Sequence, residues 1–216
     1  MKNVFFVCFL LLSGFSITAC AQTYSGDMAS EIANLEGFDG ISLGISADVY
    51  ITQGDYSVEV KGPEKSISNV ALSVNGDDLS IGSKRSLRSW NSRGVKVYVS
   101  MPELANINIG GAGDVEVQTP FNNMNKLDIA IGGSGDVSIS GEANTVSVSV
   151  AGSGDVDAAG VNAGRAEVSI AGSGDVKVGR VEQLEVSIAG SGDAYYMGTP
   201  SIDKSVVGSG NVRKLQ

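Results

Sequence analysis

The sequence contains no histidine, and this absence excludes a large part of protein chemistry. Histidine is the side chain that ordinarily titrates near neutral pH, and it is the commonest metal ligand in proteins. No Ser-His-Asp or Cys-His catalytic arrangement can be built from this chain, and neither can a zinc site that uses histidine.

Cysteine, proline and aromatic residues are also scarce: the chain has 2 Cys, 4 Pro and 6% aromatic residues among 216. Cys8 lies in an N-terminal apolar segment and is lost if that segment is removed, so we expect no intramolecular disulfide. Glycine, in contrast, is abundant at 29 residues. Abundant glycine with so little proline is not the composition of a disordered linker.

Positively charged residues are few: the sequence has 15 Lys and Arg but 24 Asp and Glu, which gives a net charge of −9. Removal of an N-terminal segment that contains Lys2 would make the net charge −10. This acidity disfavours nucleic acid and anionic membrane surfaces as electrostatic partners. It is compatible with a neutral or cationic surface ligand.

The N-terminus has the plan of a secretory signal peptide. Lys2 precedes an apolar run over 4–12, which is too short to span a bilayer as a helix. The following Ile-Thr-Ala-Cys resembles a bacterial lipobox, in which Cys20 becomes the lipidated first residue of the mature protein. Residues 1–19 are then the signal peptide. The alternative is ordinary cleavage after Ala21, since Ala-Cys-Ala is also an A-x-A site.

Residues 20–36 are polar and are predicted to form a tether, with room for a brief helical turn near Met28 to Leu35. Alternating apolar residues from Ile41 to Ile51 then predict a strand buried on one face, followed by a turn and a return strand over 56–61. A hairpin is predicted around 75–78 and a further strand over 95–99. Residues 83–94, with four basic side chains around Trp90, indicate an exposed loop.

The second half repeats one short motif of the form Gly-x-Gly-Asp-Val. Its acidic position advances by 22, 19, 20, 18 and 18 residues, which indicates a repeat architecture. The six copies begin at Gly111, Gly133, Gly152, Gly172, Gly190 and Gly208.

Alternation of apolar and polar residues continues through the glycines of each motif. Val168, Ile170, Gly172, Gly174 and Val176 fall on one parity, which predicts two strand segments joined by a glycine corner. Eighteen to twenty-two residues suit one coil of a β-solenoid. We therefore predict an all-β protein: a β-solenoid with regular repeats over 105–216 and an N-terminal β layer that shares its core. That layer would cap one end, and residues 213–216 would guard the other. The variable returns are 140–144, 158–165 and 179–183.

The acidic residues of the motif should stack into a ladder on one edge. Oxygen ligands suit Ca²⁺, which makes a calcium site between coils one interpretation. The favoured interpretation is structural: each carboxylate accepts hydrogen bonds from amides of its own turn, as in Asx turns. No resident metal or cofactor is predicted. The ladder comprises Asp114, Asp136, Asp155, Asp175, Asp193 and Asn211.

An enzymatic alternative is a carboxylate pair of the kind used in glycoside hydrolysis, for which Asp155 and Asp157 are the candidates. The opposing interpretation is two solvated acids on a β face, and aromatic residues for sugar stacking are few. Trp90 and the run 195–197 are the aromatic anchors available for binding, although Tyr196 has the inward parity of a core residue. Rows of serine, such as Ser147 and Ser169, form a polar face suited to glycans or proteins.

The sequence resembles the head GIN domain family of auto-transporter adhesins. The resemblance rests on the Gly-Ser-Gly-Asp-Val repeats, the opening over 38–60, and the ending over 194–202 followed by Gly208 to Val212. It covers about 37–216 and implies a secreted or surface β-solenoid of Gram-negative bacteria, without catalytic residues. The expected function is that of a non-enzymatic envelope or secreted binding protein that uses an extended polar face. The alternatives are a structural envelope protein and a polysaccharide-active β-helix enzyme. The ligand is an unknown glycan or protein, nucleic acid is not expected, and a lipid anchor is the expected contact with the membrane.

Overall fold

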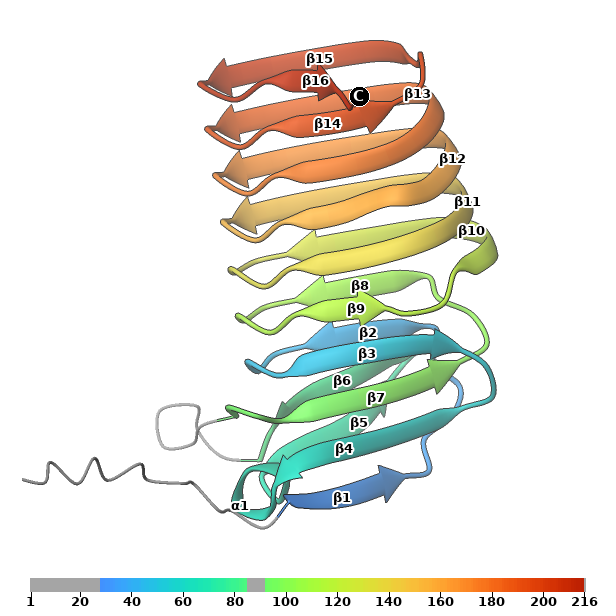
Figure 1. Cartoon of the computed structure of the whole chain (residues 1–216), viewed down its shortest axis with the longest axis vertical. Helices are drawn as coiled ribbons and strands as arrows, with labels where there is room; N and C mark the ends of the chain where they lie inside the picture. Colours follow the sequence, from blue (N-terminus) through green and yellow to red (C-terminus); the bar gives the residue numbers. More distant parts are fainter. Residues whose placement is uncertain (1–27, 85–91, 216) are drawn as a thin grey trace, which may run out of the picture.

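The computed structural model describes residues 28–84 and 92–215, and most of these residues lie in β-strands. Successive strands wind into coils that stack along one axis (Figure 1), so the predicted β-solenoid is confirmed. The solenoid strands are β2 (Gly40–Leu43), β3 (Asp48–Gln53), β8 (Asn106–Ile109), β9 (Val115–Val117), β10 (Phe121–Ile131), β11 (Val137–Gly152), β12 (Val156–Gly172), β13 (Val176–Gly190), β14 (Ala194–Met197), β15 (Ser201–Gly208) and β16 (Val212–Lys214).

Each coil pairs in parallel with the next, and the register places like residues on top of one another. Val148 of β11 lies beside Val168 of β12, which lies beside Val186 of β13. All three side chains are buried, because the inward positions of these coils carry aliphatic residues. A slip of one residue would expose this whole set, so the alternation fixes the register.

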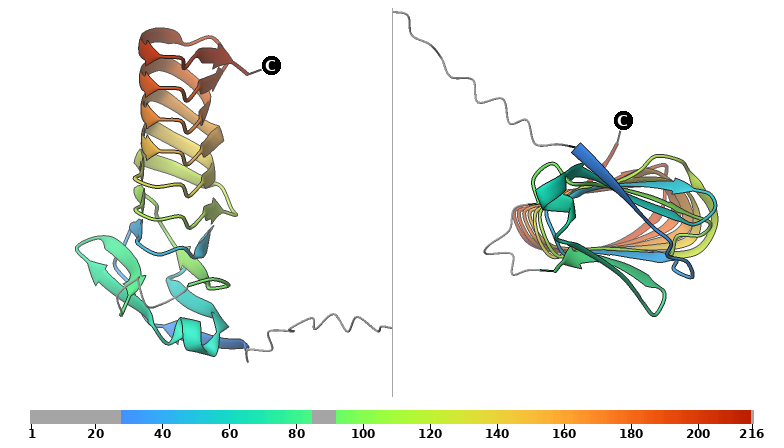
Figure 2. Two further views of the ribbon diagram at one scale, coloured as in Figure 1. Left: turned by 90° about the vertical axis from the view of Figure 1, so that its left-hand side faces the viewer. Right: turned by 90° about the horizontal axis from the view of Figure 1, so that it is seen from below.

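The coils have two different edges, which we name by their chain geometry. At the corner edge, the Gly-x-Gly-Asp motifs turn the chain sharply between two strands. At the return edge, β11, β12 and β13 each continue from one face of the solenoid to the other within a single long strand. Seen from below in Figure 2, the coils form a narrow loop around a core of side chains.

The N-terminal layer consists of β1 (Met28–Ala33), β4 (Ser57–Pro63), α1 (Glu64–Ile67), β5 (Val70–Asn75), β6 (Asp78–Ser83) and β7 (Lys96–Met101). The predicted hairpin is confirmed as β5 and β6, whose antiparallel pairing closes on Gly76 at φ 64°. The return strand β4 pairs with β1 and β7, while β7 lies between β4 and β3. The layer closes the N-terminal end of the stack and shares the core (Figure 1).

Two expectations for this region are wrong. The helical turn near Met28 is a strand, β1, because its backbone groups pair with β4 from Met28↔Pro63 to Ala33↔Val58. The strand expected over 41–51 is two strands, β2 and β3, separated by a corner at 44–47. Ile45 and Ala47 remain buried through that corner, so the alternation of the sequence does not reveal the turn. Trp90, Arg85 and Arg88 lie outside the described residues, as do the signal peptide and Cys20.

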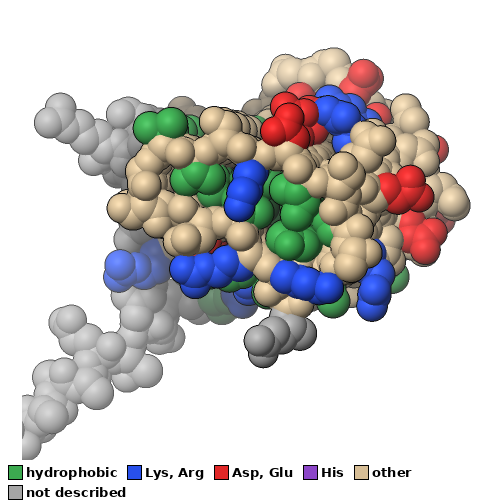
Figure 3. All heavy atoms as spheres, turned by 90° about the horizontal axis from the view of Figure 1, so that it is seen from above, with side chains coloured by type: hydrophobic (Ala, Val, Ile, Leu, Met, Phe, Trp, Pro, Cys, Tyr) green, Lys and Arg blue, Asp and Glu red, His purple; other side chains and the backbone are tan. Residues whose placement is uncertain are grey.

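The last coil of the described residues has an uncovered outer side. Within the described residues, β15 pairs only with β13, and every residue of β15 is exposed. Lys204 and Lys214 stand in register with Val186 and Tyr196 of the coil below, at positions that face the core elsewhere. Viewed from above, exposed hydrophobic side chains lie among Lys and Arg (Figure 3). Charge at an inward position is a recognised device against edge-to-edge association.

Candidate functional site

The acidic ladder lies on the corner edge and forms one continuous hydrogen-bonded row. The backbone N–H of Asp155 donates to Oδ1 of Asp136 at 2.8 Å, and that of Asp175 donates to Oδ1 of Asp155 at 2.7 Å. The same bond joins the other members at 2.7–3.0 Å, from Asp114 up to Asn211. Each carboxylate thus accepts an amide of the next coil, whereas the sequence interpretation assigned it to amides of its own turn.

The ladder therefore joins each coil to the next through hydrogen bonds. Hydrogen bonds to a charged acceptor are stronger than bonds between neutral groups. Among the described residues, no group of three or more Asp, Glu, Cys or His side chains is arranged to hold a metal ion. Burial acts to raise the pKa of Asp193, but hydrogen bonds from Asn211 and Tyr195 outweigh it and lower that pKa.

The corner at 44–47 precedes the ladder and lacks the Gly-x-Gly motif: Ile45 and Ala47 lie against Gly111 and Gly113 of the next corner. The N–H of Val49 donates to the carbonyl of Asp114 at 2.8 Å, as Val115 does to Asp136. A Cβ on Gly113 would lie 2.3 Å from the carbonyl oxygen of Ala47, so glycine is needed where a corner sits on the one before it.

The carboxylate pair proposed for glycoside hydrolysis is engaged in structural contacts. Asp155 takes part in the ladder, and Asp157 accepts the amide of Ala159 at 3.2 Å and pairs with the ammonium of Lys177 at 3.2 Å. Asp155 lies on the corner edge and Asp157 lies on β12, and neither lines any of the hollows described below.

The structure brings together an aromatic pair that the sequence did not predict. Tyr50 of β3 and Tyr98 of β7 stack with ring centroids 5.2 Å apart and an interplanar angle of 18°. The ammonium groups of Lys61 and Lys96 lie 4.8 and 5.3 Å from the centroids of Tyr98 and Tyr50. The rings are therefore occupied by one another and by cations, an arrangement that stabilises neighbouring strands. Tyr196, as expected from its parity, packs against the core.

One predicted serine row is in register on the face formed by β11, β12, β13 and β15, whereas Ser147 lies in register with Glu167. Ser149, Ser169, Ser187 and Ser205 stack into a serine column. Beside this column, the guanidinium of Arg165 forms ion pairs with Glu167 at 2.7 Å and with Glu185 of the next coil at 2.8 Å. These charged groups are therefore paired with one another. Part of the charge on this face is therefore neutralised within the face itself.

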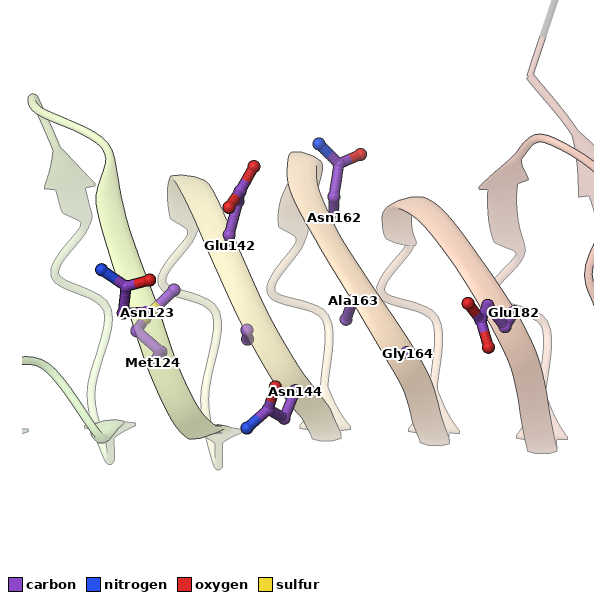
Figure 4. A pocket seen from close by; sticks show the side chains of 9 residues that line it. Asn123, Met124, Glu142, Asn144, Asn162, Ala163, Gly164 and Glu182 are labelled. Atoms are coloured by element: carbon purple, nitrogen blue, oxygen red, sulfur yellow. The ribbon is translucent and has the colours of Figure 1, made fainter.

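A groove crosses the coils at the return edge, and we call it the return-edge groove (Figure 4). Its volume is about 410 Å³. Its floor is made by Met124, Ala143 and Ala163, which are small or largely buried. The groove exists because these turns carry Ala and Gly where the flat faces carry Val and Ile.

Polar side chains from consecutive coils wall the groove. On one side, Glu142 lies in register with Asn162, and Figure 4 shows both extending the same way from neighbouring coils. On the other side, Asn144 donates to Oδ1 of Asn125 at 3.2 Å, and Glu182 follows two coils later. The side chains of Glu142, Asn162 and Glu182 make no hydrogen bond or ion pair with the described part of the chain. Their unused hydrogen-bond donors and acceptors line the hollow.

A second hollow, of about 640 Å³, adjoins the groove and shares Asn123 and Met124 with it. Asp39 and Glu103 line it, while Lys126 on its rim pairs with Asp128 at 2.8 Å. Burial, and then the nearby carboxylates led by Asp77, raise the pKa of Asp39. The combined hollow is therefore electronegative.

The sequence interpretation did not find these groove residues, because it treated the returns over 140–144, 158–165 and 179–183 as variable connections. One signal was present. The segments Glu142-Ala143-Asn144 and Asn162-Ala163-Gly164 both place alanine between polar or small residues, and they recur at the coil spacing. Finding the site from that signal requires knowing that the returns stack in register.

Comparison with solved structures finds the same fold in proteins of Bacteroides and Parabacteroides species. A crystal structure described as a putative adhesin from Bacteroides fragilis has a TM-score of 0.73 and 22% identity, covering 88% of this chain and 98% of that one. A second adhesin so described, from Parabacteroides distasonis, has a TM-score of 0.61 and 20% identity, covering 88% and 98%. A structure from the same species, described as a putative lipid binding protein, has a TM-score of 0.55 and 25% identity, covering 89% and 98%.

A comparison with curated proteins finds no match. Within the described residues, no helix has the length and apolar character needed to cross a membrane. A family model described as "Putative auto-transporter adhesin, head GIN domain" matches residues 37–200, which is most of the chain. Because that match agrees with the coils and corners described above, the protein belongs to the head GIN domain family.

Proposed function

We propose that this protein is an exported, non-enzymatic binding protein of adhesin type, and that it holds its ligand in the return-edge groove. The observation that carries the proposal is a continuous hollow whose walls hold unpaired polar side chains, Glu142, Asn162 and Glu182. Many of the other charged groups on the coils are engaged by the acidic ladder or by ion pairs such as Arg165–Glu185.

Binding without catalysis agrees with the residues available. The chain lacks histidine, and the carboxylates of Asp155 and Asp157 serve coil contacts. A general acid or nucleophile must be free to reach a reacting bond, which neither of these groups is. Carboxylates that wall the groove, such as Glu142, serve as hydrogen-bond acceptors in this proposal.

We also propose a lipid anchor at Cys20. The segment from Cys20 to Met28 can extend at most about 29 Å, so an anchored chain would hold β1 near the membrane. The C-terminal end lies at the opposite end of the stack (Figure 1). The groove residues belong to β10, β11, β12 and β13, which lie between the two ends. Export to the outer membrane or cell surface follows, or a periplasmic or secreted location if Cys20 is not lipidated.

The anchor is tested by metabolic labelling with a radioactive fatty acid. The native chain should incorporate label into the membrane fraction, and Cys20→Ser should not. Equal labelling of the two chains would remove the anchor from the proposal.

Binding is tested with the purified mature chain on arrays of glycans, matrix proteins and bacterial envelope fractions. The double variant Glu142→Ala/Asn162→Ala should lose the signals that the native chain produces. The matched control is Ser149→Ala/Ser169→Ala, which removes polar groups from the serine column and should bind like the native chain. If the control loses binding and the groove variant keeps it, the flat face is the site. An envelope defect on gene deletion, without any binding on the arrays, would favour a structural role instead.

A further inference from the structure

We infer that the return-edge groove takes one linear glycan chain of neutral or amino sugars, lying along the solenoid axis. This inference rests on the proposed function and names its ligand class. The groove is repetitive along the solenoid axis. Its floor and walls come from corresponding positions of consecutive coils, such as Ala143↔Ala163 and Glu142↔Asn162. Neighbouring parallel strands are about 4.8 Å apart, so polar groups recur along the groove at that interval.

The interval suits a polysaccharide better than a peptide. An extended peptide advances by about 3.3 Å per residue, and its contacts would fall out of step with the coils. A sugar unit in an extended polysaccharide advances by nearly the coil spacing, so equivalent hydroxyls can meet equivalent side chains. The backbone of the coils is already paired in the ladders of β10, β11 and β12, which leaves no free strand edge in the groove for a peptide.

The side chains of the walls match hydroxyl groups. An asparagine amide both donates and accepts, and a carboxylate accepts. Sugar hydroxyls also do both, so Asn123, Asn162 and Glu142 can each bond a hydroxyl without burying an unpaired group. The floor of Met124 and alanines offers an apolar strip for the C–H face of a sugar ring. Without an aromatic ring in this groove's lining, each sugar contributes little, and affinity must come from the number of units bound.

The negative charge of the groove restricts the class of ligand further. Glu142 and Glu182 line the groove, Asp39 and Glu103 line the adjoining hollow, and Lys126 is paired with Asp128. A chain of uronic acids or sulfated sugars would meet like charge there, which is unfavourable. Neutral sugars avoid this repulsion, and the ammonium groups of amino sugars would gain from it.

The experiment is isothermal titration calorimetry on the mature chain with three length series of two to six units. The probes are cello-oligosaccharides (neutral), chitosan oligosaccharides (cationic) and oligogalacturonides (anionic). We expect affinity to rise with length to about four units and then level off, since four coils at about 4.8 Å supply the groove. The anionic series should bind at least about tenfold more weakly than the others, and chitosan binding should weaken with added salt.

The matched variants are Asn162→Ala in the groove and Ser169→Ala in the serine column, both checked for native circular dichroism. Asn162→Ala should weaken binding about fivefold, the effect of one lost hydrogen bond, and Ser169→Ala should leave it unchanged. Equal affinity for all three series, no dependence on length, or no effect of Asn162→Ala would overturn the inference. If the groove double variant abolishes array binding while none of the three series binds, the proposed function stands and the glycan class is wrong. If array binding survives that variant, the groove itself is wrong.

Discussion

The most demanding prediction concerns Gly172, the first glycine of the fourth repeated motif. Its φ of 149° is a conformation that residues with a side chain rarely adopt, and a Cβ there would lie 2.0 Å from the carbonyl oxygen of Gly152. That oxygen already accepts the N–H of Ser173 at 2.9 Å. To make room for Gly172→Ala, the two coils must move apart and lengthen this bond.

The magnitude follows from three contributions. An unfavourable backbone conformation costs about 1–3 kcal/mol, overpacking costs about 1–3 kcal/mol, and a weakened hydrogen bond costs about 1 kcal/mol. We therefore expect Gly172→Ala to lower the free energy of unfolding by about 3–7 kcal/mol, which is a large part of a typical domain stability. The measurement is guanidinium unfolding followed by far-ultraviolet circular dichroism.

The control is Gly132→Ala, one residue before the second motif. Its nearest neighbour to an added Cβ is the carbonyl oxygen of Ile109 at 3.8 Å, and its φ is not in the restricted range. The next coils carry Ala151 and Ala171 at the corresponding position. Gly132→Ala should be neutral or stabilise by up to about 1 kcal/mol. If the two variants differ by less than about 0.5 kcal/mol, the account of the corners is wrong.

Three further predictions concern the ladder and the last coil. Asp155→Ala should lower the unfolding free energy by about 1–2 kcal/mol, with Asp155→Asn closer to native because the amide oxygen still accepts the next coil's N–H; equal losses would deny the bond a role. Because the folded pKa of Asp193 is lowered, its contribution to stability is present above pH of about 4 and is lost as the pH falls through the folded value. Unfolding free energies at pH 6 and pH 3 should therefore differ less for Asp193→Asn than for the native chain, and an unchanged difference would contradict this. Lys204→Val/Lys214→Val should increase self-association in sedimentation velocity, since apolar inward positions would then complete an unpaired edge; no change would mean that the lysines do not guard the end.

The repeated half was predictable because its periodicity carries direct physical meaning. Val168 and Ile170 must face the core together with the corner glycines, and only stacked coils bury that parity in every repeat. The N-terminal half was harder, since Ile41 to Ile51 keeps one parity through a corner that contains no Gly-x-Gly motif. Met28 to Ala33 carries little apolar pattern of its own, and its strand forms because β4 offers a free edge.

The candidate site was less predictable than the fold. Glu142, Asn162 and Glu182 lie 20 residues apart in the sequence in segments that differ in composition, and they share a groove because the returns stack. The acidic ladder shows the same limit. Its residues are evident in the sequence, but the donor to each carboxylate belongs to the next coil.

The sequence by itself determined the architecture of this protein, because inward aliphatics, corner glycines and a coil-length period are local patterns with one economical packing. Only the tertiary structure decided where unsatisfied polar groups gather. That depends on which residues of different coils become neighbours, on which of them satisfy one another, and on where small side chains leave the surface hollow. The coils could therefore be predicted from the sequence, whereas the return-edge groove forms only when the coils stack.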